Sequence, residues 1–195
     1  LTWTNPSLSV MAIPSAIIAF IVALVLCFKQ NWAPALTPAY AALEGCFLGA
    51  ISLMFEATYP GLVFQAVMLT FGTFFALLMA YKSKLIPVTD KFRMGIVAAT
   101  GGIFLLYLIT WIGSFFGMQS SFLHGSGAFS IGLSVVIVIV AALNLVLDFD
   151  FIERGAKSGQ MPKYMEWYGA FGLLVTLVWL YVEMLRLLSK LQSRA

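Results

Sequence analysis

The sequence predicts an all-α protein, a polytopic bundle of about six transmembrane helices that forms a single domain over residues 1–195. Of the 195 residues, 62% are hydrophobic and only 10% are charged, and the mean hydropathy is +0.98. A soluble domain carries about 25% charged residues. Because so few charges cannot cover so much apolar surface, the composition requires a bilayer as solvent.

Six apolar segments support this prediction, and each is about long enough to cross a hydrocarbon layer of about 30 Å. They cover residues 9–28, 38–55, 60–81, 92–116, 128–151 and 167–188. The connections between them are short, so neighbouring helices are expected to be antiparallel. The chain begins at Leu1 rather than Met, and its first five residues resemble the exit of an earlier segment. We therefore expect a missing N-terminal helix, which would make seven.

The joints between the segments have recognisable local chemistry. Thr37 and Pro38 are typical of an N-cap followed by proline at the first helical position, and they predict the start of the second segment. The pair at 60–61, Pro-Gly, indicates a tight turn, and Thr89 with Asp90 indicates the cap of the fourth helix. A Gly-rich stretch at 155–162 separates the last two segments.

The basic residues predict an orientation. Eight of the eleven Lys and Arg residues lie in the connections at 29–37, 82–91 and 152–166 or at the adjoining helix ends, and the connections on the opposite side hold none. By the positive-inside rule, the side that holds the eight is cytoplasmic. This arrangement places residue 1 and the C-terminus on the outer side.

Several functional classes lack their signatures. The sequence has no phosphate-binding loop, no GxSxG and no metal-like spacing of its two cysteines, so we expect no enzyme and no tightly bound cofactor. The Gly-x-Gly-Asp motif of an intramembrane aspartyl protease is absent as well. The net charge of +3, without a basic run, predicts the lipid bilayer rather than nucleic acid as partner.

Acidic residues inside the apolar segments are the functional candidates, because a charge in hydrocarbon is expensive. Glu44 and Asp148 have only apolar residues at the following helical-turn positions. Each must find a partner on another helix, hold a proton or contact water. Asn144 lies one turn before Asp148 and would line the same helix face with polar groups.

The two other intramembrane acids have a cation on their own helix. Asp150 is followed four residues later by Arg154, the spacing of an ordinary helical ion pair. Glu183 is followed three residues later by Arg186, so part of its charge is expected to be paired locally. These spacings favour a structural role for Asp150 and leave both roles open for Glu183.

Three stretches resemble the Bax inhibitor-1-like family, most closely its bacterial YccA-like branch. They are Pro38-Ala-Tyr-Ala-Ala-Leu-Glu-Gly45, Leu147-Asp-Phe-Asp-Phe-Ile152 and Leu180-Tyr-Val-Glu-Met-Leu-Arg186. The resemblance runs from Pro38 to the C-terminus. It implies a seven-helix bundle in a bacterial inner membrane and a pH-sensitive calcium leak. It also implies a carboxylate pair, which maps onto Asp148 and Glu183.

The leading hypothesis is therefore a proton-gated cation leak with calcium as the permeant or regulatory ion. A close pair formed by Asp148 and Glu183 would share a proton, and its loss would expose negative charge and oxygen ligands suited to calcium. Glu44 and Asn144 would line the pathway or form internal hydrogen bonds, and Asp150 is the alternative partner. The longer connection between the two acids requires an extended fifth segment or a later start of the sixth.

Two other functional classes remain open at this stage. A non-transporting scaffold or regulatory subunit of another membrane protein would use the same acids as structural hydrogen-bonding anchors. A secondary transporter is a third class, but the paired interrupted helices and the internal repeat that indicate one are not evident. Flux through the purified protein alone distinguishes the leak from the scaffold.

Overall fold

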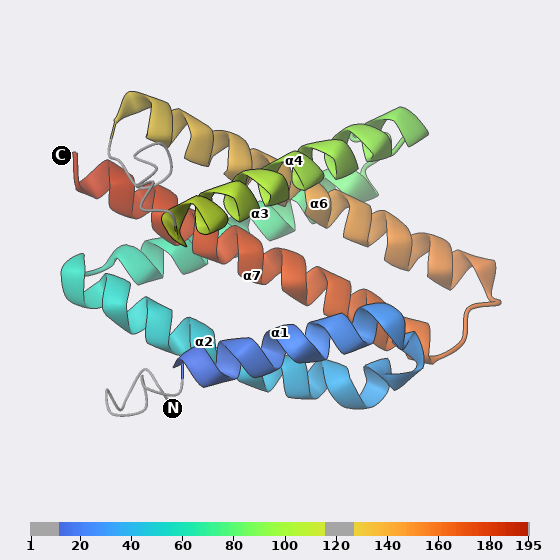
Figure 1. The fold of residues 1–195 in the computed structure, drawn as a ribbon. Coiled ribbons are helices and arrows are strands. Elements are labelled where there is room, and N and C mark those ends of the chain that lie inside the picture. The colour runs from blue at the N-terminus through green and yellow to red at the C-terminus, as the bar shows by residue number, and fades with distance from the viewer. Residues whose placement is uncertain (1–11, 116–126, 195) are drawn as a thin grey trace. The chain divides into compact units, whose positions relative to one another are not determined.

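The computed structural model describes residues 12–115 and 127–194, which form six α-helices, one short 3-10 helix and no strand (Figure 1). The all-α prediction is confirmed. The elements are α1 (Ala12–Phe28), η2 (Gln30–Trp32), α2 (Ala33–Thr58), α3 (Leu62–Lys82), α4 (Asp90–Phe115), α6 (Ala128–Ser158) and α7 (Tyr164–Gln192). The predicted helix start at residue 9 and helix end at residue 116 lie outside the described residues, as does the expectation about the N-terminus.

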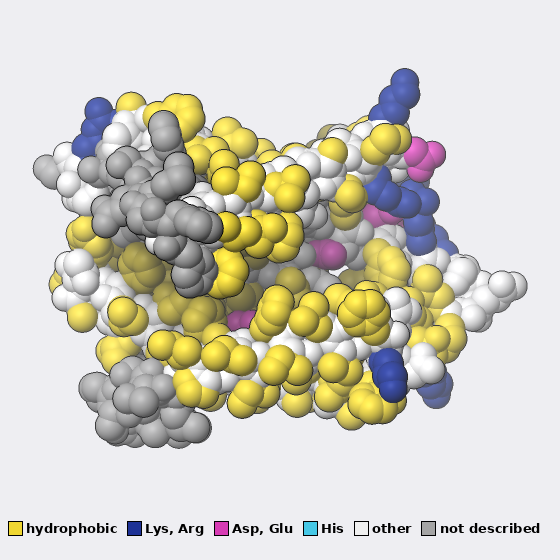
Figure 2. Space-filling model, in the orientation of Figure 1, with side chains coloured by type: hydrophobic (Ala, Val, Ile, Leu, Met, Phe, Trp, Pro, Cys, Tyr) yellow, Lys and Arg dark blue, Asp and Glu magenta, His cyan; other side chains and the backbone are white. Residues whose placement is uncertain are grey.

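Five of these helices are long and apolar enough to cross a membrane, and α1 is a shorter apolar helix. Large hydrophobic side chains are exposed along them, for example Phe64 at 70%, Phe104 at 64% and Ile139 at 51%. Figure 2 shows hydrophobic side chains along the helices and Lys and Arg side chains toward the helix ends. Such surfaces are stable against lipid rather than water, so the chain is an integral membrane protein.

The predicted start of the second helix is wrong. α2 begins at Ala33, with a proline in its first turn, and Pro38 lies inside the helix. Pro34 occupies the position where a missing N–H costs nothing, so it begins the helix in place of Pro38. The Thr37 hydroxyl does not cap this helix but donates a hydrogen bond to the Trp167 carbonyl at 3.2 Å.

The ends of α6 and α7 also differ from the predicted ones. α6 continues to Ser158, seven residues beyond the predicted end, and α7 begins at Tyr164 rather than residue 167. Two i to i+4 ion pairs involve this extension: Glu153 with Lys157 lies on it, and Arg154 on it pairs back to Asp150. Such pairs stabilise a polar helix end once it leaves the hydrocarbon, and apolar periodicity alone did not detect it.

Two predicted joints are confirmed, the cap at Thr89 and the turn at Gly61, and Glu56 stabilises the second of them. The Thr89 hydroxyl accepts a hydrogen bond from the Phe92 amide at 3.2 Å, as an N-cap does. Gly61 has φ +82, the left-handed conformation that a tight turn requires. The Glu56 carboxylate accepts from the Gly61 and Val63 amides at 2.7 and 3.2 Å, so it satisfies the N-terminus of α3.

The chain divides into two compact units, and α6 and α7 each contribute to both. The first unit comprises the residues up to Gln65 and Asp148–Val178. In it α1 packs against α2, and a buried cluster joins these helices to the first half of α7. The cluster consists of Ala19, Leu26, Ala33, Tyr40 and Phe171. The prediction that the chain forms one domain stays a prediction.

The second unit comprises Ala66–Leu147 and the residues from Trp179 onward. Its buried side chains come mainly from α6 and α7 and include Ile137, Leu145, Leu180 and Leu185. Side-chain hydrogen bonds join its helices pairwise, α4 to α6, α4 to α7 and α6 to α7. Interhelical polar contacts of this kind fix helix positions where lipid provides no hydrophobic driving force between helices.

Candidate functional site

Three acidic side chains share a feature that the other described acids do not show. Glu44, Asp148 and Glu183 each have one carboxyl oxygen that is fully buried and has no hydrogen-bond partner within the described chain. A buried polar atom without a partner costs free energy, and far more so if it is charged. Such groups therefore need an explanation beyond packing.

Asp148 lies in the first unit, on α6 beside α7. Its carboxyl group is within hydrogen-bonding reach of the Thr176 side chain, while Oδ2 is the buried oxygen without a partner. A Cβ placed on Gly172 would lie 3.6 Å from Asp148 Oδ1, an ordinary van der Waals contact, so the carboxyl group lies directly against this position of α7. Within the described part of this unit, the neighbour of the Asp148 carboxyl group is thus a neutral hydroxyl, and no ion pair of Asp148 occurs there.

Glu44 also lies in the first unit, one helical turn after Tyr40 on α2. The two side chains are hydrogen-bonded, and Glu44 Oε2 has no partner in the part of the chain that the structure describes. The Tyr40 ring packs edge-on against Phe171 with centroids 5.0 Å apart. This contact anchors Tyr40 in the core and thereby holds the hydroxyl that Glu44 uses.

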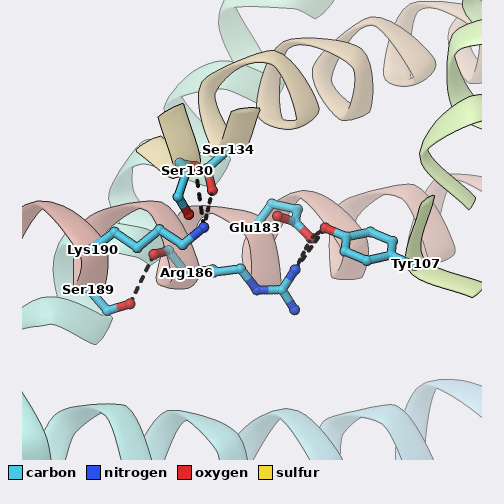
Figure 3. Close-up of polar contacts among 7 residues, drawn as sticks. All are labelled: Tyr107, Ser130, Ser134, Glu183, Arg186, Ser189 and Lys190. Carbon is cyan, nitrogen blue, oxygen red and sulfur yellow. Dashed lines mark hydrogen bonds and ion pairs between the residues drawn. The ribbon is translucent and has the colours of Figure 1, made fainter. Parts of the chain in front are cut away.

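Glu183 lies in the second unit, where it is 2% exposed and has a partner on each of two helices (Figure 3). The Tyr107 hydroxyl donates to Glu183 Oε1 at 2.6 Å, and an Arg186 guanidinium nitrogen lies 3.0 Å from the same oxygen. The expected local pairing with Arg186 is confirmed. Glu183 Oε2 is buried and has no partner within residues 12–115 and 127–194.

Tyr107, Glu183 and Arg186 form a triangle of contacts, and the bond from Arg186 to Tyr107 fixes the direction of the other hydrogen bonds. Arg186 donates to the Tyr107 oxygen at 2.7 Å, so the hydroxyl proton is free to point to Glu183. The guanidinium also lies over the Tyr107 ring, 5.3 Å from its centroid. Tyr107 thus accepts from a cation and donates to an anion, which fastens α4 to α7.

The remaining predicted site residues have clear local partners. The predicted ion pair of Asp150 with Arg154 is confirmed at 2.8 Å. The Asn144 amide donates to Thr100 on α4 and to the Val140 carbonyl, both at 2.8 Å. Within the second unit, Asn144 therefore acts as an internal hydrogen-bonding group.

The structure gives Asp148 and Glu183 different partners, in different units. Thr176, beside Asp148, and Glu183 are seven residues apart on α7, a rise of about 10 Å along the helix axis. Direct contact between the two carboxyl groups stays a prediction. No group of three or more His, Cys, Asp or Glu side chains with metal-binding spacing occurs among the described residues, and calcium ligation by this pair also stays a prediction.

Sequence reasoning did not identify Tyr107, Tyr40 or Thr176 as partners of the buried acids. Tyr40 could have been found, because it lies four residues before Glu44, the distance of one helical turn. Tyr107 and Glu183 are 76 residues apart in sequence, and no local pattern joins them.

A comparison with protein families identifies one match. The family model described as Bax inhibitor 1 like matches residues 1–193, nearly the whole chain. No curated protein and no solved structure matches the chain.

Proposed function

Since this chain belongs to the Bax inhibitor 1-like family, we propose that it is a pH-sensitive cation leak with calcium as a permeant ion and membrane-buried carboxyl groups as its proton-sensitive elements. The observation that carries the proposal is a buried oxygen on each of Glu44, Asp148 and Glu183 that has no hydrogen-bond partner among the described residues. The proposal includes the gating roles of Asp148 and Glu183.

A carboxyl group with a partnerless oxygen in a membrane has two states of low free energy. It is tolerated when the group is protonated, because a neutral group costs much less to bury than a charged one. It is also tolerated when a cation supplies the missing interaction, and calcium prefers oxygen ligands of this kind. A proton-sensitive cation pathway alternates between these two states, the protonated group and the cation-bound group.

The direction of the pH dependence follows from this chemistry. Raising the pH removes the proton and leaves a negative charge, which attracts cations and loosens helix contacts, so the leak rises with pH. Asp148 is the principal proton-sensitive group, because its neighbour Thr176 is neutral. Glu183 is already balanced in part by Arg186 and contributes chiefly to the attraction of cations.

The test is calcium flux into dye-loaded proteoliposomes that contain only the purified protein, followed from acidic to mildly alkaline pH. The variants are Asp148→Asn and Glu183→Gln, with Asp150→Asn as matched control. The control changes the same residue type two positions away on α6, where the carboxylate is paired with Arg154 at 2.8 Å.

We expect flux that rises with pH in the native protein and in Asp150→Asn, with a flattened pH profile in Asp148→Asn. An unchanged profile in Asp148→Asn would remove this residue from the mechanism. Absence of flux at every pH would contradict the leak and favour a scaffold or regulatory subunit, whose acids are structural hydrogen-bonding anchors.

A further inference from the structure

Lys190 is a membrane cation that the proposed gate does not use. It lies near the end of α7, is 7% exposed, and its ammonium donates to the Ser134 hydroxyl at 2.8 Å and to the Ser130 carbonyl at 3.4 Å (Figure 3). The two serines, on α6, are 2% and 3% exposed. The ammonium is therefore held by neutral oxygens in a buried environment.

The charge of Lys190 is not balanced by a carboxylate in the described part of the chain. The acid within its electrostatic range is Glu183, which already forms the 3.0 Å ion pair with Arg186. With all three groups ionised, the cluster of Glu183, Arg186 and Lys190 has a net charge of about +1, since two cations face one anion. This excess charge lies on α7, with Lys190 in the last turn of the helix.

Packing alone does not account for such a residue. A neutral side chain of similar length would fill the same space without the cost of burying an ammonium. The Ser130 hydroxyl, which is buried beside the Lys190 ammonium, has no hydrogen-bond partner in the described chain. The hydrogen bonds of the ammonium within the described chain therefore go to the Ser134 hydroxyl and the Ser130 carbonyl, both neutral, and they leave its charge unbalanced.

We infer that Lys190 is a specificity-determining residue, a fixed positive charge that opposes the approach of cations to Glu183 and opposes divalent ions more strongly than monovalent ones. The inference rests on the proposed cation leak and adds to it a residue that limits the rate and sets the ion preference. Arg186 cannot have this role alone, because Glu183 offsets its charge.

The effects of Lys190 on divalent and monovalent ions are related in a way that does not depend on its distance from the ion. Coulomb energy is proportional to the charge of the permeating ion, so the factor that Lys190 imposes on a divalent ion is the square of the factor for a monovalent ion. At an effective dielectric constant of about 20 and a separation of about 10 Å, one unit charge corresponds to about 17-fold for potassium and about 280-fold for calcium. These are upper values, because salt and water screen the charge.

The experiment compares potassium and calcium flux through the native protein, Lys190→Met and Lys190→Arg in proteoliposomes. Methionine keeps the length of the side chain and removes its charge, whereas arginine keeps the charge. Ser134→Ala is the matched control, because it removes the 2.8 Å hydrogen bond and leaves the ammonium in place. Size-exclusion profiles show whether each variant is folded, and Lys190→Gln serves if the methionine variant is not.

We expect Lys190→Met to raise both fluxes, with the calcium factor close to the square of the potassium factor. Lys190→Arg and Ser134→Ala should stay within about twofold of the native protein, a small effect compared with that of a removed charge. Equal factors for the two ions, or unchanged flux in a folded Lys190→Met, would overturn the inference while the leak stands. Absence of both ion fluxes from the native protein and every variant would refute the leak itself.

Discussion

The hydroxyl of Tyr107 is the group whose removal tests the second unit most cleanly. Tyr107→Phe keeps the ring that lies under the Arg186 guanidinium and deletes two hydrogen bonds, the 2.6 Å bond to Glu183 and the 2.7 Å bond from Arg186. Buried side-chain hydrogen bonds in a membrane protein contribute about 0.6 kcal/mol on average and up to about 1.7 kcal/mol. Loss of both should lower the free energy of unfolding by about 1–3 kcal/mol.

Thermal unfolding of the purified protein in a mild detergent measures this loss. A domain of this length loses about 2–4 °C of Tm per kcal/mol, so the expected decrease is about 2–12 °C. Tyr168→Phe is the matched control, because the Tyr168 ring packs against Phe151 and Phe171 and no hydrogen bond of its hydroxyl occurs within the described chain. Its Tm should stay within about 2 °C of the native value, the effect of less than about 1 kcal/mol.

A double-mutant cycle with Glu183→Leu, which removes the oxygen that accepts from Tyr107, separates the hydrogen bond from other effects of the substitution. If the 2.6 Å contact is the source of the stability, the two substitutions should be non-additive by about 0.5–2 kcal/mol. Additive losses, or equal Tm values for Tyr107→Phe and Tyr168→Phe, would refute the view that this triangle fastens α4 to α7.

Two further predictions concern the first unit. Gly172→Leu should displace the Asp148 carboxyl group and shift the pH of half-maximal calcium flux, because a Cβ there would already touch Oδ1 at 3.6 Å and leucine adds three more carbons. Gly101→Leu is the control, since its added Cβ would meet no atom within 4 Å. Equal shifts in both variants would count against the geometry at Asp148. Thr37→Val removes the 3.2 Å hydrogen bond to the Trp167 carbonyl, so it should cost about 0.6 kcal/mol in detergent unfolding, and a more stable variant would contradict that role.

Local sequence features predicted what depends on a few neighbouring residues. Hydropathy identified the membrane-spanning helices, the Thr89 cap is confirmed at 3.2 Å, and the i to i+4 spacing identified the Asp150–Arg154 pair. Each of these depends on the repeat of a single helix, which a sequence displays directly. The predicted start of α2 was wrong because two prolines, Pro34 and Pro38, lie four residues apart. Only Pro34 lies in the first turn, where the missing N–H of a proline costs nothing.

The contacts of the buried acids could not be predicted in the same way. Polarity inside an apolar segment marked Asp148 and Glu183 as unusual, and both have a buried oxygen without a partner in the described chain. Their neighbours Thr176 and Tyr107 come from other helices, and helix packing in lipid decides which of many hydroxyl groups lies opposite. Sequence therefore located the candidate groups, and the structure supplied their surroundings.

The most direct test of the account is whether the buried acids hold protons at neutral pH. Infrared spectroscopy of the protein in lipid detects the carbonyl stretch of a protonated carboxylic acid, which an ionised carboxylate lacks. We predict such a band in the native protein, with a clear loss of intensity in Asp148→Asn. Asp150→Asn should keep the band, because the native Asp150 is ion-paired with Arg154 and so does not contribute to it. A native protein without the band, or an Asp148→Asn variant with undiminished intensity, would contradict the claim that this carboxyl group is a proton-holding element.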